Sequence, residues 1–360
     1  MKQFITRLIL TILPVVLLIP AVNYYVDPAH VYSYKEYEKG IVSALQSHKY
    51  VTNVDANHNE RYFKKVLIDS CKTREINFLI LGSSRIMLIS DDMLGDANVL
   101  NLGVSGATYE DITALCYYYI KKYGFPRKVL IGIDPQHFNE NIGDSRWTEL
   151  TKEYNDYKRD VLKDSTVLSA NDNKISNLFS PSYFQSAIKY LWKNSFHLEG
   201  QIPIQAVDIA DGIKVVCRDG SILYDREYTN RSLEMVNKEA LSLEYGQWES
   251  FNDLSQNEIV RWKCFIEYLQ SNGIQIYFQE AAFHPITYQR FLNEPKYKGM
   301  VLAMDYVNEL ANMYDIPILG AYNPTKYGLN SSDFYDGMHM KLETESLYLR
   351  PLIKYEKGVN

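Results

Sequence analysis

Short apolar runs that end in glycine or in a polar residue recur along this chain, and segments with helical spacing separate them. The first run, residues 78–81 (FLIL), ends at Gly82, and further runs cover residues 99–102 and 128–133. Short, unbroken runs of this kind are typical of strands buried in a parallel sheet. A helix expected over residues 107–123 completes the strand–helix–strand alternation of right-handed βαβ units. The sequence therefore predicts an α/β fold with a central, mostly parallel sheet.

Capping residues mark the starts of two expected helices. Thr108 is the expected N-cap of the helix over residues 107–123, and the spacing of Ser255 and Glu258 fits a capping box before a helix that ends near Ser271. The alternation resumes there. The other elements expected in this part are a strand at 274–278, a helix at 299–313, a strand at 316–319 and a closing helix at 341–353.

The alternation is lost between about residues 138 and 254. Pro181 is expected to start a helix that ends at Trp192, and residues 213–224 are expected to form a hairpin that turns at Asp219-Gly220. We interpret this segment as an insertion or cap over the sheet, and not as a second complete domain. The α/β domain is then expected over residues 60–360.

Residues 1–25 are typical of a targeting or anchoring segment. Lys2 and Arg7 precede an apolar run at 8–22, and Tyr24 and Tyr25 follow it. This favours one uncleaved transmembrane helix that leaves the rest of the protein, beginning with a juxtamembrane segment at 26–59, outside the cytoplasm. A cleaved signal peptide is the alternative, although no small-x-small cleavage site follows the run.

Charge and cysteine content exclude several classes of protein. The formal net charge of −6 gives no basic footprint for nucleic acid. The four cysteines are far apart, without a CxxC pair or companion histidines, which argues against a zinc site and a disulfide-dense scaffold. The sequence leaves open whether one or two disulfide bridges form. No metal ion or cofactor is expected.

Two adjacent serines follow the first expected strand. Ser84 would be a nucleophile if a histidine and a carboxylate reach it, and Ser83 would face the other way. The alternative is a turn that only caps the next helix. The sequence is not the nucleophile elbow of α/β-hydrolases, because Arg85 and Ile86 follow Ser84 where the second glycine is required.

Asp336 and His339 lie after the last expected strand, three positions apart. This spacing lets the carboxylate hold one imidazole nitrogen while the other nitrogen acts as a general base towards a serine. A pair that merely hydrogen-bonds within a surface loop is the alternative. Gly103 and Gly106 follow the second strand, where their backbone N–H groups could form an oxyanion hole or simply a turn.

These motifs, in this order, resemble the SGNH/GDSL hydrolases. The resemblance rests on GSS at residues 82–84, NLGVSGAT at 101–108 and the D-x-x-H pattern at 336–339, and it omits the middle insertion. It implies a flavodoxin-like, three-layer sandwich. It also implies Ser84 as the nucleophile, Asp336 and His339 as its partners, and the N–H groups of Ser84 and Gly106 as oxyanion donors.

One block departs from the family pattern. The third sequence motif (block) of the family usually reads G-x-N-D, and its asparagine is another oxyanion donor. This chain has GIDP at the corresponding place, with Asp134 where the asparagine is expected. An ionised Asp134 cannot donate a hydrogen bond and would oppose an oxyanion. Arg85 is the candidate that would neutralise Asp134 or supply the missing donor, with a weak surface ion pair as its alternative. His284, in EAAFHP after an expected strand, is a candidate substrate contact or a structural histidine.

The N-terminal anchor and the GSSR sequence look most similar to the extracytoplasmic DltD-like and alginate O-acetylation-like branches. This resemblance implies acyl transfer or ester hydrolysis on a cell-envelope polysaccharide or teichoic-acid-like polymer, beside a membrane-bound O-acyltransferase. The resemblance does not decide between hydrolysis and transfer. Two alternatives remain: an inactive binding or scaffold protein on the same fold, and a lipid or peptidoglycan hydrolase.

Overall fold

The protein is an α/β protein with a five-stranded parallel sheet. A computed structural model describes residues 2–27, 32, 34–54, 58–73, 75–95, 98–142, 144–169, 178–193, 204–249 and 251–356. The sheet has the order β3-β2-β4-β8-β9, and all neighbouring strands are parallel. Its strands are β2 (Phe78–Leu81), β3 (Val99–Asn101), β4 (Lys128–Gly132), β8 (Gln275–Glu280) and β9 (Ile318–Gly320). The expected α/β class with a mostly parallel sheet is confirmed.

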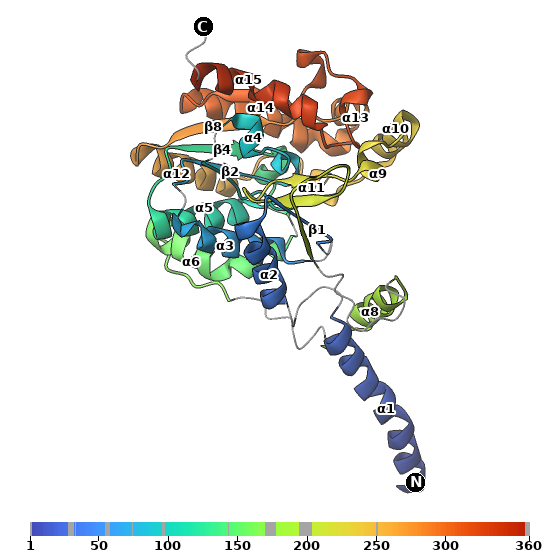
Figure 1. Cartoon of the computed structure of the whole chain (residues 1–360). Coiled ribbons are helices and arrows are strands. Elements are labelled where there is room, and N and C mark those ends of the chain that lie inside the picture. The colour runs from blue at the N-terminus through green and yellow to red at the C-terminus, as the bar shows by residue number, and fades with distance from the viewer. Residues whose placement is uncertain are drawn as a thin grey trace.

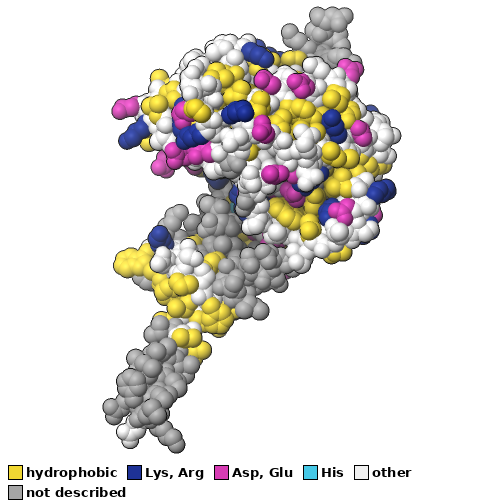
Figure 2. All heavy atoms as spheres, turned by 180° about the vertical axis from the view of Figure 1, so that it is seen from behind, with side chains coloured by type: hydrophobic (Ala, Val, Ile, Leu, Met, Phe, Trp, Pro, Cys, Tyr) yellow, Lys and Arg dark blue, Asp and Glu magenta, His cyan; other side chains and the backbone are white. Residues whose placement is uncertain are grey.

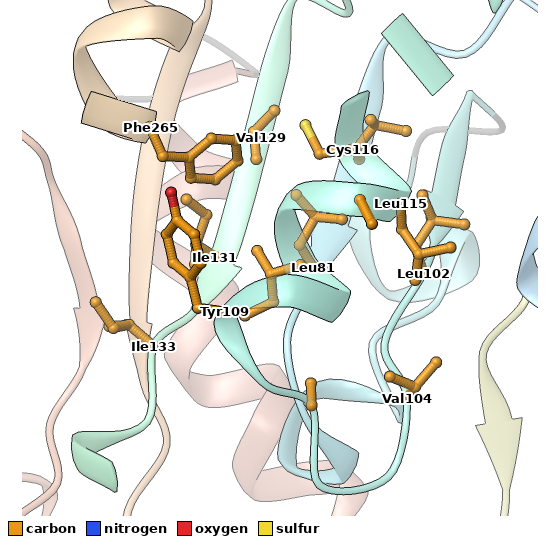
Figure 3. Close-up of a cluster of buried hydrophobic side chains, with 14 of the residues drawn as sticks. Leu81, Leu102, Val104, Tyr109, Leu115, Cys116, Val129, Ile131, Ile133 and Phe265 are labelled. Atoms are coloured by element: carbon orange, nitrogen blue, oxygen red, sulfur yellow. The ribbon is translucent and has the colours of Figure 1, made fainter. Parts of the chain in front are cut away.

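Alternate side chains of each strand enter two separate cores. Leu79 and Leu81 of β2 belong to the larger cluster, whereas Phe78 and Ile80 belong to the smaller one. This is the period of two that a strand buried on both faces requires. Figure 3 shows part of the larger cluster, in which Leu81 lies among side chains of the sheet and of neighbouring helices.

Helices cover both faces of the sheet (Figure 1). Side chains of α5 (Tyr109–Tyr123), α12 (Gln256–Ser271) and α14 (Lys298–Met313) pack in the larger cluster. The smaller cluster contains side chains of α4 (Asp91–Leu94) and α15 (Leu342–Glu356). The sheet is therefore the middle of three layers.

The predicted caps hold the starts of two of these helices. The Thr108 hydroxyl accepts a hydrogen bond from Asp111 N, and the Asp111 carboxylate accepts one from Thr108 N, which completes a capping box. Ser255 accepts a hydrogen bond from Glu258 N at the start of α12. These caps satisfy N–H groups that a helix terminus otherwise leaves unpaired.

A second, antiparallel sheet is built mainly from the middle of the chain. Its order is β5-β1-β6-β7, with strands β1 (Tyr50–Thr52), β5 (Gln205–Val207), β6 (Val215–Cys217) and β7 (Ile222–Leu223). The predicted hairpin is confirmed, because Val215 pairs with Leu223 and Val216 with Ile222.

The hairpin is docked beside the parallel sheet. Asn101 N, at the end of β3, donates a hydrogen bond to Asp219 O at 2.8 Å, and Ile222 N donates one to Met87 O at 2.9 Å. The first bond joins the predicted insertion to the end of β3. The second joins it to the segment just after β2, where Ser84 lies.

The structure contains further helices outside the two main layers. They are α1 (Lys2–Val26), α2 (Tyr34–Ser47), α3 (Glu60–Ser70), α6 (Thr151–Tyr157), α8 (Pro181–Lys193), α9 (Arg226–Thr229), α10 (Leu233–Ser242), α11 (Gly246–Glu249) and α13 (Pro285–Asn293). Short 3₁₀ and π segments join several of them, including η2 (Ser84–Ile86) and η4 (Arg146–Leu150).

The helix α1 extends away from the globular part of the molecule, and α8 lies against its C-terminal end (Figure 1). Asn23 Nδ2 donates hydrogen bonds to Leu178 O at 2.8 Å and Ser180 O at 3.1 Å. Among the described residues, no helix combines the length and the apolar character needed to cross a bilayer. The expected transmembrane helix within residues 1–25 is therefore not supported. Its charge-free run at 8–22 is shorter than the roughly 20 apolar residues that a span needs.

Candidate active site

Ser84 lies at the carboxyl edge of the parallel sheet, directly after β2. The chain turns at Gly82, whose φ is +149°, and a Cβ there would lie 2.8 Å from Gly132 O of β4. Only glycine fits such a close approach between strand ends. The Ser83 hydroxyl is buried and accepts a hydrogen bond from Arg85 N at 3.3 Å, whereas Ser84 is only half-buried. The two serines therefore face different surroundings.

The structure brings Ser84, His339 and Asp336 together. Ser84 Oγ lies 2.8 Å from His339 Nε2, although the two residues are 255 positions apart. His339 Nδ1 lies 2.7 Å from Asp336 Oδ2. A carboxylate only accepts hydrogen bonds, so Nδ1 carries the proton and Nε2 is free to accept one from Ser84. This is the tautomer that a general base needs.

The loop that carries Asp336 and His339 is closed by its own backbone. Tyr335 N donates to His339 O at 2.8 Å, and Asp336 Oδ1 accepts from Met338 N at 2.7 Å and from His339 N at 2.8 Å. Burial by itself raises the pKa of the Asp336 carboxyl. The charge and hydrogen bond of His339, together with the bonds from Tyr228 and Met338 N, outweigh burial and hold this pKa well below its usual range. Asp336 is therefore ionised at neutral pH.

Tyr228 is a part of the site that the sequence did not indicate. Its hydroxyl donates to Asp336 Oδ2 at 2.6 Å, which is the oxygen that also faces His339 Nδ1. Tyr228 lies on α9, within the predicted insertion, and burial next to Asp336 raises the pKa of its hydroxyl. No local motif marks it, because its role depends on how the insertion packs against the late loop.

Arg85 is buried and forms an ion pair with Asp134. Arg85 Nη1 lies 2.8 Å from Asp134 Oδ1, and both side chains are almost completely buried. The expected neutralisation of Asp134 is present, and the alternative of a weak surface ion pair is wrong. Asp134 Oδ2 has no hydrogen-bond partner among the described residues. Because both groups are buried, neither is exposed for direct contact with a substrate.

Arg85 also joins two further segments to the turn at Ser84. Its Nε donates to Met338 O at 3.3 Å, and its Nη2 donates to Ala282 O at 3.0 Å and to Ala281 O. The guanidinium carbon lies 3.8 Å from the centre of the Phe283 ring. Arg85 thus fixes the loop before His339 relative to Ser84.

Gly106 lies in a crowded turn with a left-handed backbone, φ +57°. A Cβ at this position would collide with the guanidinium of Arg146 and would lie 3.2 Å from the Tyr245 hydroxyl. No acceptor among the described residues pairs with the backbone N–H of Gly106 or of Ser84. Both N–H groups are therefore uncommitted donors, as an oxyanion hole requires.

Two side chains, half-buried Glu60 and buried His137, hold the turn around Gly106. Glu60 accepts hydrogen bonds from Ser105 N at 2.6 Å and from Ser105 Oγ at 2.9 Å. On the other side, His137 Nε2 lies 2.9 Å from Ala107 O, and His137 Nδ1 accepts from Asp134 N at 3.2 Å. Burial lowers the pKa of His137, so it bridges the two loops as a neutral ring. Sequence analysis had not singled out Glu60, His137, Arg146 or Tyr245.

His284 is not placed to contact a substrate. It is completely buried, and its Nδ1 accepts a hydrogen bond from Ile286 N at the start of α13. Burial lowers the pKa of His284 to about 4, so the ring is neutral. The structural alternative fits this position, and the candidate role as a substrate contact is wrong.

Metal-ligating groups do not gather in the part of the chain that the structure describes. No three His, Cys, Asp or Glu side chains there are grouped so that they could hold a metal ion. The four cysteines are unpaired, and Cys71, Cys116 and Cys217 are buried.

Acidic and basic side chains are interspersed on the face shown in Figure 2, without a broad field of lysine and arginine.

A scan against models of protein families finds no match, and a search of curated proteins finds no significant similarity.

Proposed function

We propose that this protein is a serine-dependent acyl-ester hydrolase or O-acyltransferase of the SGNH/GDSL type. The observation that carries the proposal is the continuous relay from Ser84 Oγ through His339 to Asp336, with contacts of 2.8 and 2.7 Å. A hydroxyl, a neutral imidazole and an ionised carboxylate in this order are the parts of a nucleophilic acyl-transfer site. The parallel strand order and the helices on both faces support the SGNH-like, flavodoxin-like fold.

In the first half-reaction, Ser84 Oγ attacks the carbonyl carbon of the ester while its proton passes to His339 Nε2. The tetrahedral oxyanion accepts hydrogen bonds from Ser84 N and Gly106 N. The bond to the leaving oxygen then breaks, and that oxygen takes the proton from His339 and departs as an alcohol. Asp336 stabilises the transient imidazolium through Nδ1.

In the second half-reaction, water or a sugar hydroxyl gives its proton to His339 and attacks the acyl-enzyme. The bond to Ser84 Oγ breaks, and Oγ takes back the proton. The products are a carboxylic acid with water as acceptor and a new ester with a sugar as acceptor.

The changed third block is compatible with this chemistry. Asp134 cannot donate to the oxyanion, but its charge is balanced by Arg85 at 2.8 Å. Arg146 and Tyr245 flank Gly106, and the charge of Arg146 is balanced by its ion pair with Asp144. The balanced charge of Asp134 supports an active enzyme over an inactive scaffold.

The substrate and partners follow from the resemblance alone. We infer that the acyl ester is carried by a cell-envelope polysaccharide or teichoic-acid-like polymer, and that a membrane-bound O-acyltransferase is a partner.

Ester turnover tests the proposal. The wild-type protein should hydrolyse p-nitrophenyl acetate, and Ser84→Ala should lower kcat/KM by at least about 10³-fold. Ser83→Ala is the matched control, because it changes the neighbouring serine, and it should lower turnover by no more than about tenfold. Equal losses in the two variants, or no turnover by the folded wild-type protein, would contradict the proposal.

A further inference from the structure

A pocket of about 310 Å³ is lined in part by Met87, which lies three positions after Ser84, and no residue of the proposed relay lines it. We name it the side pocket. Its volume is at the lower end of the range for small-molecule sites. The start of α3, Met87 and the β6–β7 hairpin form its walls. Its apolar lining consists mainly of Val54, Phe63, Met87, Ile213, Val216 and Ile222.

The two most deeply placed charged groups of the side pocket are already bonded within the protein. Both oxygens of Glu60 accept hydrogen bonds from Ser105, at 2.6 and 2.9 Å. Lys64 Nζ donates to Asn101 O at 3.0 Å and to Gly220 O at 2.6 Å. These groups therefore offer little to a ligand rich in hydroxyls.

Two further polar groups of the lining are also committed. The Thr52 hydroxyl donates to Lys214 O at 2.8 Å, and Asp225 Oδ1 accepts from Tyr228 N at 2.7 Å. With these four groups internally satisfied, the lining that remains is mainly aliphatic and aromatic, apart from the polar side chains of Asn53, His58 and Lys214. Such a surface binds apolar groups through the hydrophobic effect.

Two residues of the pocket lining contact the segments that carry the relay. Met87 caps η2, and its N–H donates to Ser84 O at 3.4 Å. Asp225 caps α9, which carries the Tyr228 hydroxyl to Asp336. The pocket therefore shares its supporting elements with both the nucleophile and the carboxylate.

We propose that the side pocket receives the acyl chain of the ester that Ser84 attacks, and that this chain is longer than acetyl. The inference rests on the proposed function, because the acyl carbonyl must lie at Ser84 Oγ. An apolar chain then extends past Met87 between α3 and the hairpin.

Binding without chemistry is the first test. In the Ser84→Ala protein, octanoic acid should bind measurably by calorimetry. Ile213→Trp, introduced into the same background, should weaken binding by at least about tenfold, because Ile213 lines the pocket and is 37% exposed, so the larger ring can enter from the rim. Ile209→Trp is the matched control, since Ile209 is 75% exposed and lies outside the pocket lining. It should leave binding unchanged.

Chain-length preference is the second test. With Ser84 present, kcat/KM for p-nitrophenyl octanoate should exceed that for p-nitrophenyl acetate by at least about tenfold, since each buried methylene contributes about a fourfold gain. Ile213→Trp should remove this preference. Val54→Trp provides a second blocking variant if Ile213→Trp does not fold.

The outcomes separate this inference from the proposed function. If esters are cleaved at Ser84 but octanoate has no advantage, or if the blocking variants slow acetate and octanoate equally, the acyl-chain assignment is overturned and the proposed function stands. If octanoic acid fails to bind the Ser84→Ala protein, the assignment is likewise overturned. If octanoic acid binds but neither ester is cleaved, both the assignment and the proposed function fail.

Discussion

The parallel sheet and the insertion contribute different things to the same site. Loops that follow strands of the parallel sheet carry Ser84, Asp336 and His339, which form the relay. The insertion carries Tyr228, which contacts Asp336, and one wall of the side pocket. The sheet therefore places the groups of the proposed relay, whereas the insertion contacts one of them and shapes its surroundings.

This difference reflects how the two regions are packed. All four residues of β2 are buried, as a strand between two layers of helices requires, whereas β5 of the antiparallel sheet is half-buried to exposed. Changes in the sheet-derived relay should accordingly abolish activity, and changes in the insertion should reduce or redirect it. The following predictions test this contrast.

The largest effect is expected from Asp336→Asn. The amide cannot stabilise the imidazolium and favours the wrong tautomer of His339, so kcat/KM should fall on the order of 10³- to 10⁴-fold. Initial rates with p-nitrophenyl acetate would measure this. Asp333→Asn, in the same loop, is the control and should change the rate by no more than about threefold. A loss of less than tenfold in Asp336→Asn would show that the sheet-derived relay is not what drives the chemistry.

Arg85→Met tests the buried ion pair and hydrogen bonds that hold the turn at Ser84. It leaves Asp134 as an unpaired buried charge and removes donors from three backbone carbonyls, so the free energy of unfolding should fall by about 3–5 kcal/mol. Urea denaturation at pH 7 would measure this loss. Adding Asp134→Asn should restore part of it, because the unpaired charge is then gone. If Arg85→Met is neutral, the ion pair does not hold the nucleophile turn.

Tyr228→Phe tests how much the insertion contributes to activity through its hydrogen bond to Asp336. Removing one hydrogen bond to a charged group should lower kcat/KM by roughly 10- to 100-fold. The bond lowers the pKa of Asp336, so its loss should raise that pKa, and initial rates with p-nitrophenyl acetate would measure the loss of activity. Tyr224→Phe, on the neighbouring ring, is the control. A loss as large as that of Asp336→Asn would remove the distinction between the two regions.

The smallest effect concerns a buried acid outside the relay. Burial raises the pKa of Glu345 to about 8, although a hydrogen bond from Gln279 opposes this. Because the folded-state pKa exceeds the unfolded value near 4.5, the stability it contributes is present at acidic pH and is lost as the pH rises through 8.

Glu345→Gln should remove this loss. The variant should match the wild-type protein at pH 5 and exceed its free energy of unfolding by about 1–2 kcal/mol at pH 9. Urea denaturation at the two pH values would measure the difference, and activity at neutral pH should persist in both proteins. If the free energy of unfolding changed equally with pH in the two proteins, the assignment to Glu345 would be contradicted.

Local patterns predicted the elements of the sheet and the residues of the relay. The run FLIL predicted β2, and its glycine and serines predicted the turn that exposes Ser84. The i, i+3 spacing of Asp336 and His339 predicted their mutual contact, which is now 2.7 Å. These features depend on strand period, turn chemistry and short spacing, all of which are visible in the sequence.

Contacts between distant segments were not predictable in this way. Tyr228 meets Asp336 across 108 positions, and Arg146 meets the turn at Gly106 from the insertion. The burial of His284 likewise depends on the packing of the late loop, because Phe334 lies against its ring. No local pattern distinguishes such residues from ordinary tyrosines, arginines and histidines.

Mapping the adduct of a serine-directed p-nitrophenyl phosphonate tests the central claim most directly. Mass spectrometry of the digested wild-type protein should place the phosphonyl group on Ser84 alone, and His339→Ala should slow labelling at least about 100-fold. Labelling of another residue, labelling of Ser84 that does not depend on His339, or no labelling of the folded protein would contradict the relay.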